Sequence, residues 1–176
     1  MRWPKPHAVP SIVQAQLPYN VRMLKEFLNK VFVNFGIEAP ARRRSLAQFA
    51  ARFEQRAKEL AVRFAKAPDT DKNRDRLGHI IGIERWGQRR LKVALGEEFV
   101  QDEYNGYRPD HTASWADLLA QWQATRTETT ALVRTFATQN TDVAQTIPHN
   151  SFGPLTVKGW LQYLSNHATR ESFGVR

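Results

Sequence analysis

The 176-residue sequence contains no cysteine and only five histidines. The lack of cysteine excludes a disulfide framework, a thiolate zinc site, an iron–sulfur cluster and a cysteine nucleophile. Any bound metal ion must therefore be held by His, Asp or Glu side chains. The available histidines are His7, His79, His111, His149 and His167.

Several other signals are missing. No apolar run approaches the roughly 20 residues that a membrane-spanning helix needs, and the N-terminus lacks the apolar core of a secretory signal. We therefore expect a cytoplasmic protein with no membrane partner. Neither a Gly-x-Ser-x-Gly motif nor a glycine-rich phosphate loop occurs. No segment alternates apolar and polar residues as a half-buried strand does, so the sequence predicts an all-α protein.

Positive charge is concentrated in the first half of the chain. The whole sequence has 26 Lys and Arg against 17 Asp and Glu, a net charge of +9. Residues 1–76 carry 16 basic and 7 acidic side chains, so 16 − 7 = +9 lies there, and residues 77–176 carry 10 of each. Such a basic half can attract nucleic acid or an acidic protein partner. The alternative is a solvated, charged helix face.

Apolar residues recur at helical spacing in five segments. We expect helices near 20–35, 45–67, 70–95, 114–138 and 156–173, with Ser45, Ser114 and Thr156 as N-caps. Residues 1–19 contain four prolines and are expected to be extended, Gly36 is expected to end the first helix, and a break is expected at 38–40. Two long loops, 96–113 and 140–155, separate the later helices. The pattern predicts a bundle of four helices over 45–176, preceded by an N-terminal extension, 1–44, with one amphipathic helix.

The amphipathic helix of the extension has a strongly apolar face. Its members are Val21, Leu24, Phe27, Leu28, Val31, Phe32 and Phe35. An apolar face of this size is costly to leave in water and commonly marks an interface. We expect it to pack either on its own bundle or on a second subunit, which makes a homodimer one of the expected partners.

Two polar residues lie on the apolar side of the last predicted helix. His167 and Glu171 are four residues apart, so they share one helix face. His79, on the third predicted helix, is the natural third member of a two-histidine, one-carboxylate metal site. A lone histidine on an apolar face is more often a hydrogen-bonded core residue, so the spacing alone leaves both interpretations open. Glu84 is expected in an exposed contact with Arg85 or Gln88.

The stretch 77–86, Leu-Gly-His-Ile-Ile-Gly-Ile-Glu-Arg-Trp, resembles the second bundle helix of the DinB superfamily. The later order of features is also similar: a Tyr/Pro loop at 104–109, Ser-Trp-Ala-Asp-Leu-Leu at 114–119, Phe-Gly-Pro-Leu-Thr at 152–156, and Trp-Leu-Gln-Tyr-Leu at 160–164 followed by His167. The similarity covers about residues 45–174.

This resemblance implies a four-helix, up-down-down-up bundle with a divalent metal site. By position, His79 is similar to the first ligand of the family and His167 to the second. The third position, usually a histidine, is occupied by Glu171. The implied cofactors are a divalent ion (zinc, nickel, iron or manganese) and, for some members, a low-molecular-weight thiol. The implied function is a metal-dependent enzyme, either a thiol-dependent transferase or a hydrolase, acting on a small molecule. The alternative is a non-catalytic bundle whose basic half binds nucleic acid or an acidic protein.

Overall fold

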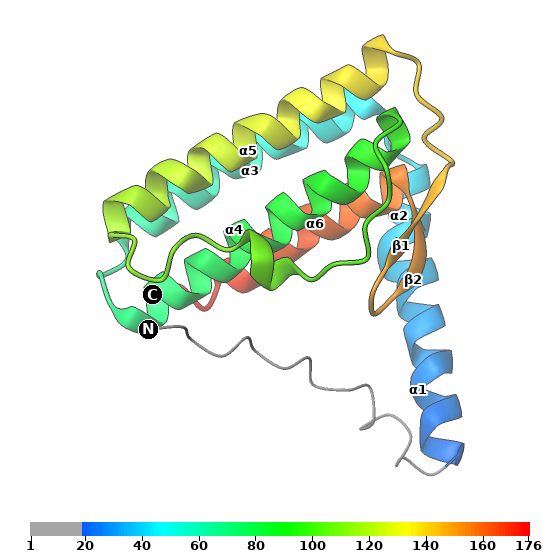
Figure 1. Cartoon of the computed structure of the whole chain (residues 1–176), viewed down its shortest axis with the longest axis horizontal. Coiled ribbons are helices and arrows are strands. Elements are labelled where there is room, and N and C mark those ends of the chain that lie inside the picture. Colours follow the sequence, from blue (N-terminus) through cyan, green and yellow to red (C-terminus); the bar gives the residue numbers. More distant parts are fainter. Residues whose placement is uncertain (1–18) are drawn as a thin grey trace, which may run out of the picture.

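The computed structural model describes residues 19–176, and the expected extended N-terminus lies almost entirely outside them. Helices dominate the described chain (Figure 1). In order, the elements are α1 (Tyr19–Val31), the π-helix η2 (Phe32–Glu38), α2 (Ala39–Arg42), α3 (Leu46–Lys66), α4 (Asp71–Lys92), the 3-10 turns η3 (Val93–Leu95) and η4 (Tyr104–Tyr107), α5 (Trp115–Thr138), β1 (Thr146–His149), β2 (Gly153–Thr156) and α6 (Val157–Ser172).

The starts of the long helices follow from their capping residues. The Ser45 and Ser114 hydroxyls accept hydrogen bonds from the backbone N–H three residues later, and Gln48 and Asp117 return the bond, which completes two capping boxes. Thr156 accepts from the Gly159 N–H at the start of α6. The four later helices therefore begin where the sequence predicted.

Two expectations about secondary structure were wrong. The segment expected as a loop at 140–155 contains an antiparallel hairpin, β1–β2, in which Ile147 pairs with Leu155. Each strand has only four residues, too short to show alternation in the sequence. In addition, helical structure continues through Gly36 to Arg42, because the chain widens into the π-helix and Pro40 occupies the first turn of α2, where its missing N–H costs nothing.

Helices α3, α4, α5 and α6 pack together as the body of the molecule (Figure 1). A buried ion pair joins α4 to α5: Arg126 Nη2 lies 2.7 Å from Glu84 Oε2, and both side chains are about 2% exposed. Thr129 Oγ1 donates a second contact to Glu84 Oε1 at 2.7 Å. Glu84 is thus buried, which corrects the exposed contact expected for it, and its pKa is raised by desolvation against the opposing effect of Arg126.

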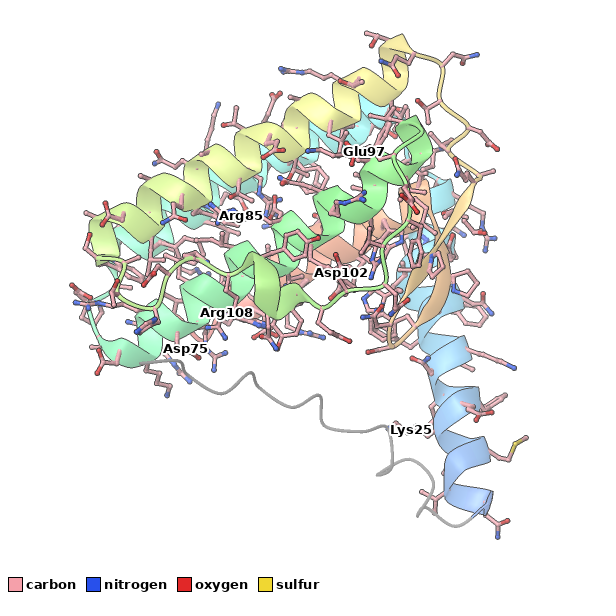
Figure 2. All side chains as sticks on the ribbon, viewed as in Figure 1. Lys25, Asp75, Arg85, Glu97, Asp102 and Arg108 are labelled. Carbon is pink, nitrogen blue, oxygen red and sulfur yellow. The ribbon has the colours of Figure 1, made fainter. Side chains whose placement is uncertain are left out.

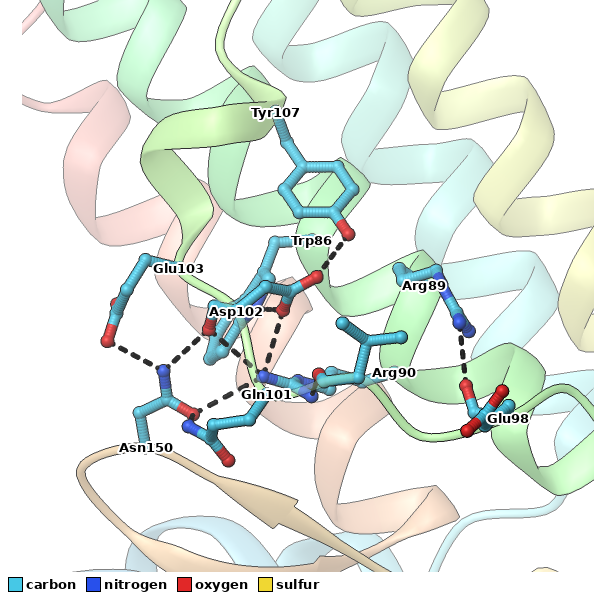
Figure 3. Close-up of polar contacts among 10 residues, drawn as sticks. Trp86, Arg89, Arg90, Glu98, Gln101, Asp102, Glu103, Tyr107 and Asn150 are labelled. Atoms are coloured by element: carbon cyan, nitrogen blue, oxygen red, sulfur yellow. Dashed lines mark hydrogen bonds and ion pairs between the residues drawn. The ribbon is translucent and has the colours of Figure 1, made fainter. Parts of the chain in front are cut away.

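A long connection, 96–114, runs back along the bundle from the end of α4 to the start of α5 (Figure 1). Asp102 fixes this connection to α4, because its carboxylate accepts hydrogen bonds from Trp86 Nε1 at 2.9 Å and from the Tyr107 hydroxyl at 2.5 Å (Figure 3). Arg90 adds an ion pair at 3.0 Å. Asn150, in the hairpin turn, donates to the Asp102 carbonyl at 2.8 Å. The connection, α4 and the hairpin are therefore tied together at one end of the bundle.

Helix α1 projects away from the bundle, with Lys25 along its outer part (Figures 1 and 2). Its apolar face stays in contact with solvent in the described chain: Leu24, Phe27 and Leu28 are 57%, 62% and 55% exposed. Packing of this face on the chain's own bundle, one of the two expected outcomes, is not what residues 19–176 adopt. Within those residues, none of the helices combines the length and the apolar character that crossing a bilayer requires.

Candidate metal centre

Helices α4 and α6 bring His79 and His167 together. Their ring centroids lie 5.1 Å apart, and the ring planes are inclined at 57°. His167 is buried, with 6% of its surface exposed, whereas His79 is partly buried. Two imidazoles that bind one zinc ion at 2.0–2.1 Å have centroids about 5 Å apart. The observed separation fits this arrangement.

The surroundings keep both rings uncharged near neutral pH. The pKa of His167 is lowered to about 3, chiefly by burial and in addition by the neighbouring His79 and Arg170. The pKa of His79 is also lowered by burial, against the attraction of Glu171. Within the described chain neither ring has a hydrogen-bond partner. Neutral imidazole is the form that binds metal ions, so both rings are in the competent state.

Glu171 lies one helical turn beyond His167, and its carboxylate is paired with two arginines. Its carboxylate is 3.4 Å from Arg76 Nη1 and 3.3 Å from Arg170 Nε, and its side chain is 22% exposed. Accordingly, residues 19–176 contain no group of three His, Cys, Asp or Glu side chains already placed to hold a metal ion. The two histidines are therefore placed to bind one metal ion. Glu171 could act as the third ligand only if its carboxylate left Arg76 and Arg170.

Tyr104 covers the His79 side of this centre, with ring centroids 5.1 Å apart and planes at 87°. The turn that carries Tyr104 lies directly on α4 because Gly82 has no side chain: a Cβ there would be 2.7 Å from Arg108 Cγ. Arg108 anchors the turn by donating to the Asp75 carboxylate at 2.5 Å (Figure 2). The sequence analysis expected a long loop here but did not indicate which of its residues would reach the histidines.

His149 lies in an aromatic cluster that leads from the histidine pair to the hairpin. It belongs to β1 and is 7% exposed. Its ring lies 4.7 Å from Tyr163 and 4.9 Å from Trp160, and Tyr163 in turn lies 5.8 Å from His167. The backbone N–H groups of residues 151 and 152 donate to His149 Nδ1, which places the proton on Nε2, a buried atom with no hydrogen-bond partner. By contrast, His111 has a 95% exposed side chain.

Desolvation also acts on Tyr163, whose ring contacts both His149 and His167. Burial raises its pKa to about 12, so it remains protonated and can serve as a hydrogen-bond donor. The sequence analysis singled out Tyr163 only as part of the Trp-Leu-Gln-Tyr-Leu stretch at 160–164. Its position beside His167 follows from their four-residue separation on α6, and the packing of α6 against the hairpin brings it to His149.

The two uncharged histidines lie on two helices that pack against each other. Proteins of the helix-bundle class build metal and ligand sites in this way, from side chains on facing helices. The model of the DinB superfamily matches residues 45–170. This chain is therefore a member of the DinB superfamily, as its sequence features indicated, and that superfamily includes metal-dependent enzymes. Comparison with curated proteins and with solved structures gives no match.

The buried state of His149 predicts a pH-dependent stability. Its pKa is lowered from 6.5 to about 4 by burial, followed by the charge of Arg90. Between those two values the unfolded chain binds a proton that the folded chain does not, so the free energy of unfolding falls as the pH decreases through this window. The slope from this one ring is at most about 1.4 kcal/mol per pH unit. Urea denaturation of the wild type and His149→Gln should show a shallower pH dependence in the variant.

His111→Gln is the matched control for this experiment, because that ring is exposed. Equal pH dependence of the His149→Gln variant and the wild type would contradict the burial of an uncharged ring at position 149.

Proposed function

We propose that this chain is a divalent-metal-dependent enzyme acting on a small molecule, with His79, His167 and Glu171 as ligands. The observation that carries the proposal is the pair of neutral imidazoles 5.1 Å apart, one buried and one partly buried, without hydrogen-bond partners in the described chain, on the helices where the family places its ligands. An ion bound between the rings would give their nitrogen atoms the partner that residues 19–176 do not supply. We also propose that α3, α4, α5 and α6 form the up-down-down-up bundle, which the returning connection between α4 and α5 supports (Figure 1).

A divalent ion at this position would supply a Lewis acid that lowers the pKa of a bound thiol or water. The chain's own residues would provide the remainder of the site. Tyr104 limits access from the His79 side, and the protonated Tyr163 hydroxyl is available to orient a substrate oxygen. Because the sequence has no cysteine, the thiol of a transferase reaction would come from a small cofactor. A water nucleophile would instead give hydrolysis.

Metal titration tests the ligand set. Cobalt(II) or zinc binding, followed by absorption spectroscopy or calorimetry on the full chain, should weaken by at least about tenfold in His79→Asn and His167→Asn, because each variant loses an imidazole ligand. Glu171→Gln should weaken binding, and Glu171→His should retain or strengthen it. Metal should also raise the melting temperature of the wild type by linkage.

Glu59→Gln is the matched control, because Glu59 is likewise a partly exposed glutamate paired with an arginine, Arg56, at 2.5 Å. It should bind metal as the wild type does. Wild-type protein that binds no divalent ion, or histidine variants that bind as tightly as the wild type, would contradict the proposal.

We further propose that α1 associates with α1 of a second copy of this chain. Val21, Leu24, Leu28 and Val31 are spaced by three, four and three residues, the spacing of a coiled-coil seam. All four are exposed within the described chain, and α1 projects from the bundle so that a second helix can lie along it (Figure 1). The proposed association would therefore bury an apolar face that is otherwise hydrated.

Light scattering after size-exclusion chromatography tests this association. The wild type should be a dimer, and Leu24→Glu combined with Leu28→Glu should be a monomer, because two buried charges cannot be accommodated in the seam. Lys30→Glu, on the opposite side of α1, should remain a dimer. A wild type that is monomeric at its highest soluble concentration would overturn the proposal.

A groove beside the extension favours a second candidate function, the binding of an acidic polymer. This groove, of about 730 Å³, is lined by Phe35, Arg43, Arg44 and Arg52, among others. Within residues 19–176, none of the three arginines forms an ion pair with an acidic side chain. Burial lowers the pKa of Arg52, and the adjacent positive charge of Arg44 adds to that effect. Phe35, which is 75% exposed, offers a stacking surface next to the arginines.

Fluorescence anisotropy with a labelled single-stranded DNA, measured over a salt series, tests the second candidate. Arg43→Gln and Arg44→Gln should each weaken binding and reduce the salt slope by about one. Arg134→Gln, which removes an exposed arginine from α5, should have no comparable effect. Absence of salt-dependent binding by the wild type would exclude this candidate and leave the metal-dependent enzyme.

A further inference from the structure

A small cavity opens beside His167. Its volume is about 220 Å³, and its apolar walls come from three parts of the chain: Phe32 and Ile37 of η2, Phe152 of the hairpin turn, and Tyr163 of α6. The Phe152 ring lies 5.6 Å from Phe32 and 5.7 Å from Tyr163. The polar groups of the lining lie on α6, where Asn166, His167 and Arg170 contribute to the cavity. The cavity is therefore an apolar space with a polar, cationic side.

The η2 wall of this cavity lies outside the segment that matches the DinB superfamily, which begins at residue 45. It is nevertheless firmly attached to the bundle. The buried Glu38 carboxylate accepts hydrogen bonds from the Thr156 N–H and hydroxyl, both at 2.9 Å. Asn166 Nδ2 donates to the Gly36 carbonyl at 3.5 Å, and Asn29 Nδ2 donates to the Ser151 carbonyl at 3.0 Å. These contacts hold Phe32 and Ile37 at a fixed distance from α6.

We infer that the N-terminal segment 19–44 is a substrate-selecting wall, and that the cavity binds a compact apolar group, such as one aromatic ring, that carries a carboxylate. The inference rests on the proposed metal-dependent function, because it assigns the substrate class of that site. Three aromatic rings around a space of this size suit a flat apolar group. The guanidinium of Arg170 suits a carboxylate.

Glu171 connects the cavity to the metal centre. In the described chain its carboxylate neutralises Arg170 at 3.3 Å. If Glu171 turns towards His79 and His167 as a ligand, Arg170 loses this partner and becomes available to an anionic substrate. Metal occupancy would thus increase the affinity of the cavity for an acid relative to a neutral analogue.

Phenylacetate and its neutral analogue 2-phenylethanol are the probes for this inference, with binding measured by calorimetry or ligand-observed NMR on the full chain, with and without zinc. Phenylacetate should bind more tightly than 2-phenylethanol, and zinc should widen the difference. Phe32→Ala should weaken both probes by at least about fivefold, because part of the apolar wall is lost. Arg170→Gln should remove the preference for the acid.

Two variants serve as matched controls. Phe27→Ala removes an exposed ring of the segment 19–44 that does not line the cavity, and Arg74→Gln removes an arginine of α4. Both should bind the probes as the wild type does. Phe32→Ala that binds the probes as tightly as Phe27→Ala, or wild type that binds neither probe, would overturn the inference.

Zinc affinity, measured separately on the same variants, distinguishes this inference from the proposed function. Phe32→Ala should bind zinc as the wild type does, since Phe32 is not a ligand. Probe binding that depends on Phe32 and Arg170 in a chain that binds no zinc would refute the metal-dependent function but retain the selecting wall.

Discussion

The buried carboxylate of Glu38 is the constraint on which the arrangement of the site depends. It accepts two hydrogen bonds from Thr156, at the point where the hairpin ends and α6 begins. A negative charge there also interacts favourably with the N-terminus of α6. The approach is possible only because residue 159 is glycine: a Cβ would lie 2.2 Å from Glu38 Oε1. One interaction thus fixes the extension, the hairpin and the helix that carries His167.

Burial gives the site its chemical character. The same packing that excludes water from His167, His149 and Tyr163 lowers the pKa of the histidines and raises that of the tyrosine. All three side chains are then uncharged near neutral pH, which lets them share a small volume without repulsion. The charges lie at the edge instead, on Arg76, Arg170 and Glu171. A neutral interior with a charged edge suits a site where an ion is to be bound by imidazoles.

Local signals in the sequence predicted where the four later helices begin, and the resemblance to the DinB superfamily pointed to the histidine pair. Caps such as Ser45, Ser114 and Thr156 mark helix starts whatever the remainder of the fold does, and His79 and His167 fall on the inward sides of their helices. The hairpin was missed because its four-residue strands depend on packing against Trp160 and Trp86. Glu84 was misplaced because its burial depends on Arg126, which lies 42 residues further along the chain. A contact between residues so far apart in the chain does not appear in the periodic pattern of apolar and polar residues.

Helical spacing predicts Glu171 on the same side of α6 as His167, and its role as a third ligand stays a prediction. Its carboxylate has two competing environments, a pair of arginines or a pair of imidazoles. In the described chain the carboxylate pairs with Arg76 and Arg170, which are favourable partners for a negative charge. A divalent ion held by the imidazoles would compete with these two partly solvated guanidinium groups for the carboxylate. Spacing along a helix therefore identifies which side chains can reach a site, and the local charge decides whether they do.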